Sequence, residues 1–307
     1  MSVGQREPRT ITSLCLLLGY SRQALYQHQH RAEKQALQEE LLLQQVNIHR
    51  GKLKRCGGRK LFHLLGGFMQ EHGISMGRDA LFDLLRQHGL LVRKRRRRGP
   101  RTTFSHHWLH KYPNLIVDFI PTAPNQLWVS DITYIELDGE FAYLSLITDG
   151  YSHKIVGYYL SEDLTADGPL AALEMALSQL PQDFNGTLIH HSDRGVQYCC
   201  EKYVGLLLKH TIGISMTQSG NPRENPVAER ANGIFKDEFL FDRHFKNIEQ
   251  ARCAIAQDVS TYNNLRPHLS IDMLTPEQAH QQSGELKRRW KNYYNVQKRK
   301  EAAYDLV

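Results

Sequence analysis

Residues 127–140 read LWVSDITYIELDGE, and this stretch decides the fold. Aromatic and β-branched residues dominate its first part, a composition typical of a buried β-strand. Asp138-Gly139 is a dipeptide typical of a tight hairpin turn. The stretch therefore predicts a strand over residues 127–137 that returns through a hairpin into a second strand over 141–148.

The chain after this hairpin continues in an α/β pattern. One more apolar run predicts a third strand, and helical and strand patterns then alternate. The predicted elements are strand 154–160, helix 167–179, strand 186–190, helix 196–209, strand 212–216, helix 226–240 and helix 248–263. An antiparallel meander followed by alternating helices and strands predicts an α/β fold with a mixed five-stranded sheet and flanking helices.

Three acidic residues stand at informative places in this pattern. Asp131 lies inside the first strand, and Asp193 follows the predicted strand 186–190. Glu229 lies in a helix expected to begin after Pro226, with 35 residues between it and Asp193. Three converging carboxylates repel one another unless a cation neutralises them, and divalent ions in phosphoryl-transfer enzymes are held by such oxygens. The pattern therefore favours a metal-dependent site that acts on phosphodiesters.

Each acid also has a simpler interpretation. Asp131 could pair with a buried arginine, Asp193 could cap a helix, and Glu229 could be an exposed glutamate favoured by the helix dipole. Spacing alone decides little, because the chain contains 32 acidic residues. The ordered contexts of strand, strand and helix favour the catalytic interpretation.

Several longer strings carry a family resemblance. They are Trp128-Val-Ser-Asp-Ile-Thr-Tyr-Ile135, Leu146-Ile-Thr-Asp-Gly-Tyr-Ser-His-Lys-Ile-Val-Gly157, His190-His-Ser-Asp-Arg-Gly-Val-Gln-Tyr198, Ser215-Met, Gly220-Asn-Pro, Asn225-Pro-Val-Ala-Glu229, Tyr262-Asn-Asn-Leu-Arg-Pro-His268 and Thr275-Pro-Glu277. With these strings, the run from about Pro124 to Gln282 resembles the catalytic domain of bacterial insertion-sequence transposases of the DDE integrase superfamily. The specific group is that of insertion sequence three, whose catalytic frame is called OrfB.

The resemblance implies an RNase-H-like catalytic domain in which Asp131, Asp193 and Glu229 are both the catalytic triad and the metal ligands. It further implies two Mg²⁺ ions, with Mn²⁺ as a substitute, and an enzyme that cleaves the 3′ ends of terminal inverted repeats and transfers the strand. A copy-out, paste-in route through a circular intermediate and action as a homo-oligomer, at least a dimer, also follow from it. One departure is Glu224, where the family pattern has aspartate.

Lys236 is a candidate DNA contact beside the triad, and the resemblance implies the same role. It follows Glu229 by seven residues, which in a continuous α-helix places both side chains on nearly the same face. The alternative is a surface lysine whose spacing has no meaning.

Charge indicates a polyanionic partner. The chain has 39 basic and 32 acidic residues, and seven positive charges cluster in one short run without any negative charge. Its members, all predicted to bind DNA, are Arg93, Lys94, Arg95, Arg96, Arg97, Arg98 and Arg101. Double-stranded DNA fits this run, although a solvated linker between domains is compatible with it.

The part of the chain before the basic run is helical. Residues 10–29 predict a short helix-turn-helix, followed by helices over 32–48, 59–72 and 78–88. The last pair offers Arg78 on a second helix, as a DNA-recognition helix would, although a purely structural helical hairpin has the same pattern. We expect these all-α, helix-turn-helix segments to bind DNA ahead of the catalytic domain.

These patterns divide the chain into five expected parts. They are a short helix-turn-helix at 1–31, a helical DNA-binding domain at 32–92, a basic linker at 93–123, the catalytic core at 124–245 and a helical extension with a basic tail at 246–307.

The remaining features exclude some classes and leave others open. Five cysteines without a Cys-x-x-Cys pair indicate neither a zinc ribbon nor a disulfide framework, and no apolar stretch reaches the length of a membrane span. We expect a cytoplasmic, nucleoid-associated protein that needs a separate OrfA-type partner or a frameshifted fusion. An RNase-H-type nuclease and a catalytically inactive DNA-binding regulator are the rival functions.

Some histidines and a loop stay unassigned by sequence. His106, His107 and His110 have no cysteine nearby, so zinc is not indicated. His190 and His191 adjoin Asp193, and we assign neither to a metal. The polar, aromatic loop 262–268 could stabilise the fold or touch DNA.

Overall fold

The computed structural model describes residues 10–93, 107–182, 184–218 and 224–289. The chain divides into two compact units, one formed by residues 1–51 with 57–91 and the other by 52–56 with 92–307. Among the described residues, no helix combines the length and apolar character that a membrane crossing requires.

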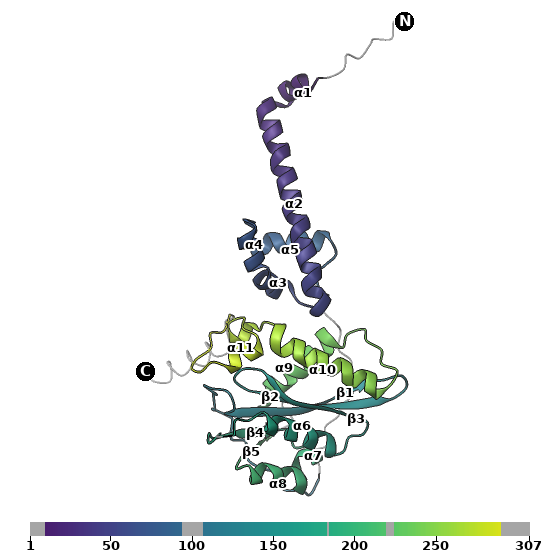
Figure 1. Cartoon of the computed structure of the whole chain (residues 1–307), viewed down its shortest axis with the longest axis vertical. Helices are drawn as coiled ribbons and strands as arrows, with labels where there is room; N and C mark the ends of the chain where they lie inside the picture. Colours follow the sequence, from purple (N-terminus) through teal and green to yellow (C-terminus); the bar gives the residue numbers. More distant parts are fainter. Residues whose placement is uncertain (1–9, 94–106, 183, 219–223, 290–307) are drawn as a thin grey trace, which may run out of the picture. The chain divides into compact units, whose positions relative to one another are not determined.

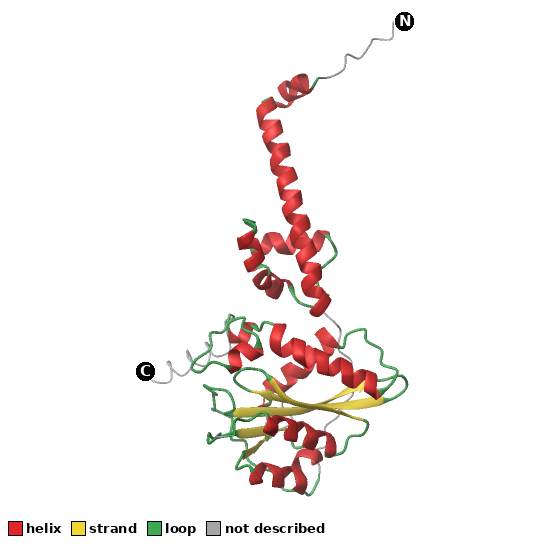
Figure 2. Cartoon of the chain, viewed as in Figure 1, coloured by secondary structure: helices red, strands yellow, loops and turns green. Residues whose placement is uncertain are grey.

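The first unit is entirely helical (Figure 2). Its helices are α1 (Ile11–Leu18), α2 (Arg22–Lys52), α3 (Gly58–Leu64), α4 (Gly66–Glu71) and α5 (Arg78–Gln87). Thr10 caps α1 by accepting a hydrogen bond from the Ser13 amide, and Gly19 ends it in the left-handed region with φ 72°. Leucine side chains of α2, α3 and α5, among them Leu42, Leu61 and Leu81, form its core.

Two details of the helical prediction for this unit are wrong. The chain was expected to break between residues 28 and 32, whereas α2 continues for 31 residues through that region, which contains no glycine or proline. The predicted helix 59–72 is instead divided at Leu65 into α3 and α4.

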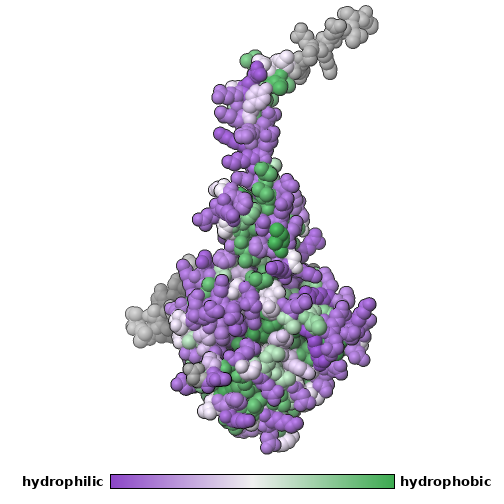
Figure 3. Space-filling view, in the orientation of Figure 1, coloured by the Kyte–Doolittle hydropathy of each residue, from purple (hydrophilic) through white to green (hydrophobic). Residues whose placement is uncertain are grey.

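Figure 3 shows mainly hydrophilic side chains along the N-terminal half of α2, consistent with its exposed residues.

The second unit contains the predicted sheet. Its strands are β1 (Leu127–Glu136), β2 (Phe141–Asp149), β3 (Ile155–Ser161), β4 (Ile189–Ser192) and β5 (Gly213–Met216), in the order β3-β2-β1-β4-β5 (Figure 1). β1, β2 and β3 form an antiparallel meander, while β4 and β5 run parallel to β1. This confirms the mixed five-stranded sheet and the RNase-H-like order of strands.

Strand β4 lies about two residues later than predicted. The expected strand covered 186–190, but the ladder begins with Ile189, which pairs with Leu127 on one side and Gly213 on the other. The polar residues His191 and Ser192 are nevertheless fully buried in the strand. Tertiary packing therefore overrides the polar local sequence, and the strand ends directly before Asp193.

Helices cover both faces of the sheet (Figure 1). On one face, α6 (Asp167–Ser178), α7 (Val196–Cys199) and α8 (Glu201–Lys209) surround a core that includes Trp128, Leu173 and Tyr203. The predicted helix 196–209 is interrupted at Cys200, whose backbone is extended. α6 lies so close to β3 that a Cβ built on Gly157 would stand 2.1 Å from the carbonyl oxygen of Ala172.

The opposite face carries the helices nearest the site. These are α9 (Pro226–Ile234), a π-helical turn (Phe235–Phe239), α10 (Ile248–Leu265), a 3₁₀ turn (Leu269–Ile271) and α11 (Pro276–His280). Ala228 of α9 packs on Leu127 and Val129 of β1. The sequence predicted one helix over 226–240, but the α-helical pattern ends at Ile234 and the π turn follows.

Candidate active site

Asp131 lies within β1, and Asp193 directly follows the neighbouring parallel strand β4. In the β1–β4 ladder, Val129 is opposite His191, and Asp131 and Asp193 each follow two residues later, Asp193 just beyond the end of β4. Parallel strands are separated by about 4.8 Å, and residues at equivalent positions point to the same face. The sheet therefore brings the two carboxylates together where β4 ends.

α9 places Glu229 against the same part of β1. Two asparagines of this helix segment fix its position: Asn225 Nδ2 donates to the Ser130 carbonyl at 3.0 Å, and Asn232 Nδ2 donates to Asp131 Oδ2 at 2.8 Å. Asn232 is one helical turn beyond Glu229, so the helix that carries the glutamate lies across the aspartate. Glu229 itself is exposed in the first turn of α9.

Sequence reasoning missed Asn232. Its amide nitrogen holds one oxygen of Asp131, while the Ile132 amide donates to the other at 2.9 Å. The available signal was its position three residues after Glu229, on the buried side of the same helix. Both oxygens of Asp131 are therefore oriented by donors.

The carboxylates influence one another electrostatically. Burial raises the pKa of Asp131 from 3.8 to about 7, and the charge of Asp193, and more weakly that of Glu229, adds to the increase. The hydrogen bonds from Asn232 and Ile132 act in the opposite direction. Asp193 and Glu229 therefore both act electrostatically on Asp131, whose negative charge is disfavoured.

This pKa shift predicts a pH-dependent stability of the metal-free protein. Between pH 4 and 7, folded Asp131 retains a proton that the unfolded chain has lost, so raising the pH through this window favours unfolding. We expect the melting temperature in EDTA to fall across this window more steeply for the natural protein than for Asp131→Asn. If the melting temperatures of the two proteins changed equally with pH across this range, the raised pKa would not belong to Asp131.

The three carboxylates have the chemical character that a divalent cation requires in its ligands. Burial is the main cause of the raised pKa of Asp131, and a cation would relieve the repulsion from Asp193 and Glu229 that adds to it; carboxylate oxygens are suitable ligands for Mg²⁺. Within the described ranges, however, no three histidine, cysteine, aspartate or glutamate side chains are grouped closely enough to hold an ion. The residues are gathered in one region without forming a closed set of ligands.

The two histidines before Asp193 are part of the packing. His190 Nε2 lies 2.9 Å from the Tyr203 hydroxyl, and His191 Nδ1 lies 2.8 Å from the Ser215 hydroxyl. Burial lowers the pKa of His190 to about 3 and that of His191 to about 4, so both rings are neutral at pH 7. Both support β4 from within the sheet.

Lys236 lies in the π turn, beside β1. Its Nζ is 3.7 Å from the ring centroid of Tyr134, three residues beyond Asp131. The α-helical spacing used to align Lys236 with Glu229 does not continue to this residue, because the π turn begins at Phe235. The lysine is nonetheless near the strand that carries Asp131.

Residues 262–268, predicted as a loop, begin inside α10, which ends at Leu265, and most of them are buried. Tyr262 is 1% exposed, and Arg266 donates two hydrogen bonds to Glu238 of the π turn, from Nε at 2.8 Å and from Nη2 at 2.7 Å. Its Nη1 lies 2.8 Å from His268 Nε2. This part of loop 262–268 therefore fastens the π turn to the C-terminal helices.

The predicted DNA-binding residues are less fully described. Arg78 begins α5, is exposed and forms an ion pair with Asp79 at 2.8 Å. Arg93 is exposed, and its carbonyl accepts a hydrogen bond from Arg55. Lys94, Arg95, Arg96, Arg97, Arg98 and Arg101 lie outside the described residues.

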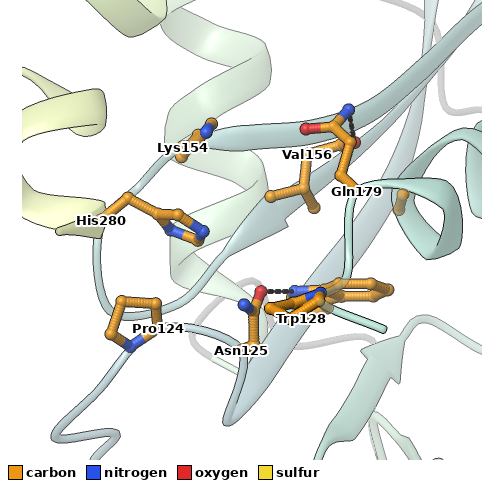
Figure 4. Close-up of a pocket in the computed structure, with 9 residues that line it drawn as sticks. Pro124, Asn125, Trp128, Lys154, Val156, Gln179 and His280 are labelled. Atoms are coloured by element: carbon orange, nitrogen blue, oxygen red, sulfur yellow. Dashed lines mark hydrogen bonds between the residues drawn. The ribbon is translucent and has the colours of Figure 1, made fainter. Parts of the chain in front are cut away.

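A cavity of about 260 Å³ lies near the start of β1, lined by Trp128, Lys154 and His280 among others (Figure 4). Lys154 pairs with Glu277 at 2.7 Å, and His280 Nδ1 is 2.9 Å from the Ser152 hydroxyl. None of the three acids lines this cavity, and it is separate from the candidate active site.

Two family models match parts of the chain. Residues 121–222 match the family described as "Integrase core domain", and residues 210–276 match a second family with the same description. The chain is 36% identical over 269 residues to the "Insertion element IS600 uncharacterized 31 kDa protein" of Shigella sonnei, covering 86% of this chain and 96% of that protein.

A second relative is "Transposase InsF for insertion sequence IS3fB" of Escherichia coli (strain K12). It is 33% identical over 201 residues, covering 65% of this chain and 69% of the relative. Among solved structures, the catalytic core domain of HTLV-2 integrase in complex with magnesium aligns with a TM-score of 0.41 and 21% identity, over 52% of this chain and 99% of that one.

Proposed function

Because the chain belongs to the IS3 family of DDE transposases, we propose that it binds the terminal inverted repeats of an insertion sequence and cuts DNA at their 3′ ends. The freed 3′ hydroxyl is then joined to another phosphodiester. Membership of this family makes the chain a polynucleotidyl transferase that acts in transposition by DNA cleavage and strand transfer.

The observation that best supports this proposal is the electrostatic effect of Asp193 and Glu229 on Asp131, together with the contact of α9, which carries Glu229, to Asp131 through Asn232. One carboxylate within β1, one directly after β4 and a third on an overlying helix suit a phosphodiester that approaches the edge where β4 ends. Asn232 and the Ile132 amide keep the Asp131 carboxylate in one orientation. Attack by a hydroxyl group needs no covalent link between the protein and DNA.

We propose Mg²⁺ as the natural cofactor, held by Asp131, Asp193 and Glu229, with Mn²⁺ as a substitute. Two such ions would lower the pKa of the attacking hydroxyl and stabilise the leaving oxygen. The carboxylates contribute position and charge, and their mutual repulsion in the metal-free site favours cation binding.

The residues proposed to contact DNA outside the triad are chosen by their positive charge and their position. Lys236 stands beside Tyr134 on β1 and is proposed to hold a phosphate of the cleaved strand. Arg78 and the basic residues 93–101 are proposed to bind the duplex, Arg78 by exchanging its exposed pair with Asp79 for a phosphate. The predicted basic linker 93–123, catalytic core 124–245 and helical extension 246–307 are kept as part of this proposal, whereas the boundary between 1–31 and 32–92 falls inside the continuous helix α2.

The proposed partners follow from the reaction. Two element ends must be held together, so we propose a homo-oligomer, at least a dimer, assisted by an OrfA-type partner. The proposed location is the cytoplasm, at the nucleoid.

The function can be tested with the full chain and a linear duplex that carries the inverted repeats flanking its gene. In Mg²⁺, we expect nicks at the 3′ ends of the repeats and joined products on a sequencing gel. EDTA or scrambled repeats should remove both. Cleavage of RNA in an RNA–DNA hybrid, with no joining of DNA, would instead indicate an RNase-H-type nuclease.

A further inference from the structure

Trp108 is the most solvent-exposed large hydrophobic side chain among the described residues, at 93% exposure. Trp128 of the same unit is 1% exposed. An indole carries a large apolar surface, and leaving it in water forgoes the free energy that its burial would provide. Such a residue on a fixed backbone is a candidate binding element.

The backbone around Trp108 is anchored on both sides. His107 Nε2 donates to the carbonyl oxygen of Arg194 at 2.8 Å, since a carbonyl can only accept. Leu109 and Tyr112 pack against the core under the sheet. The indole therefore projects from a segment whose neighbours are held in place.

This anchor lies beside the candidate active site. Arg194, the residue that His107 contacts, directly follows Asp193. Lys111 lies in the same region, because Asp193, Lys111 and Arg194 all act electrostatically on Cys199, whose pKa is raised to about 11 mainly by burial. Trp108 therefore belongs to a segment that contacts the backbone directly after Asp193, and Lys111 of the same segment carries a positive charge.

We propose that Trp108 is a stacking site for an unpaired nucleobase at the DNA end processed by this chain. Aromatic rings bind single-stranded nucleotides by stacking on the base, and nearby cations hold the phosphates. The assignment rests on the proposed function, since it concerns the DNA bound at the same site. It extends that function by specifying a substrate feature, a DNA end with unstacked nucleotides.

Nucleic acid fits this surface better than a protein partner does. The segment that carries the indole also contains Lys111 and the exposed His110, and it contacts the backbone of Arg194, whereas the centre of a protein interface is depleted in charge. A base also needs only one flat ring, and a single exposed indole supplies it.

The test compares binding of two short duplexes to the full chain without divalent cations, so that no cleavage occurs. One duplex is blunt, and the other has a three-nucleotide single-stranded extension carrying 2-aminopurine. Trp108→Ala should weaken binding of the extended duplex by about 5- to 150-fold and remove the fluorescence change of 2-aminopurine. Trp108→Phe should recover most of the affinity, and binding of the blunt duplex should be unchanged.

Ile120→Ala is the matched control, because Ile120 is an exposed apolar side chain, at 75%, on the same extended segment. It should behave as the natural protein. Equal loss of affinity on both duplexes, or no loss for Trp108→Ala, would overturn the proposal. The proposal would also be overturned if Trp108→Ala changed the oligomer mass measured by light scattering and left DNA binding unchanged. That result would indicate that Trp108 contacts another protein chain. A failure of the proposed function gives a different result: the natural protein itself would then form no strand-transfer products.

Discussion

Replacing Asp131 by Asn, Asp193 by Asn or Glu229 by Gln should each reduce 3′-end cleavage and strand transfer by a factor on the order of 1,000 or more. Each substitution keeps the size of the side chain and removes its negative charge. Affinity for the inverted-repeat duplex should stay within about threefold, since phosphate contacts made by basic residues dominate binding. Cleavage assays in Mg²⁺ together with gel-shift titrations measure both quantities.

Glu174→Gln provides the control for this series. Glu174 is an exposed carboxylate on α6, which covers the face of the sheet opposite to α9. It should retain full activity. If any of the three site variants kept near-natural strand transfer, that residue would not belong to the site.

Arg266→Ala should lower the free energy of unfolding by about 3–5 kcal/mol, the second large effect. The Arg266 side chain is 3% exposed and makes two hydrogen bonds to Glu238, which is 19% exposed. Removing the guanidinium leaves that carboxylate in the interior without its main partner. Urea unfolding followed by circular dichroism measures the change.

An exposed ion pair supplies the comparison. Arg289 contacts Asp272, and the two side chains are 51% and 36% exposed. Arg289→Ala should cost less than about 1 kcal/mol, because water screens and replaces such a pair. Equal losses for the two variants would show that burial of the Arg266–Glu238 pair has no energetic consequence.

Most of the sheet could be predicted because its local signals agree with its final environment. The aromatic and β-branched composition of residues 127–136, and the Asp138-Gly139 turn, correspond to β1 and its hairpin with β2. The helix that carries Glu229 begins at Pro226, as its sequence predicts. These signals are short-range, so they are visible without a structure.

The remaining features depend on contacts between distant segments. His191 and Ser192 have polar side chains, and only pairing with β1 and β5 makes them part of a buried strand. The π turn at Phe235–Phe239 places two phenylalanines in the core with Tyr262, a contact that helical periodicity does not reveal. Nothing in the local sequence distinguishes Asn232 from other helical asparagines. Its role depends on the contact with Asp131, which is distant in the sequence.

The close approach of β3 and α6 at Gly157 affects how genetic data on this protein are interpreted. Every amino acid other than glycine would bring a side chain against the carbonyl of Ala172. A random-mutagenesis screen for lost transposition should therefore recover substitutions at position 157 as often as substitutions of the carboxylates, although Gly157 is not part of the candidate active site. Intracellular protein abundance would separate the two classes, because variants at position 157 disappear from the cell while carboxylate variants accumulate normally.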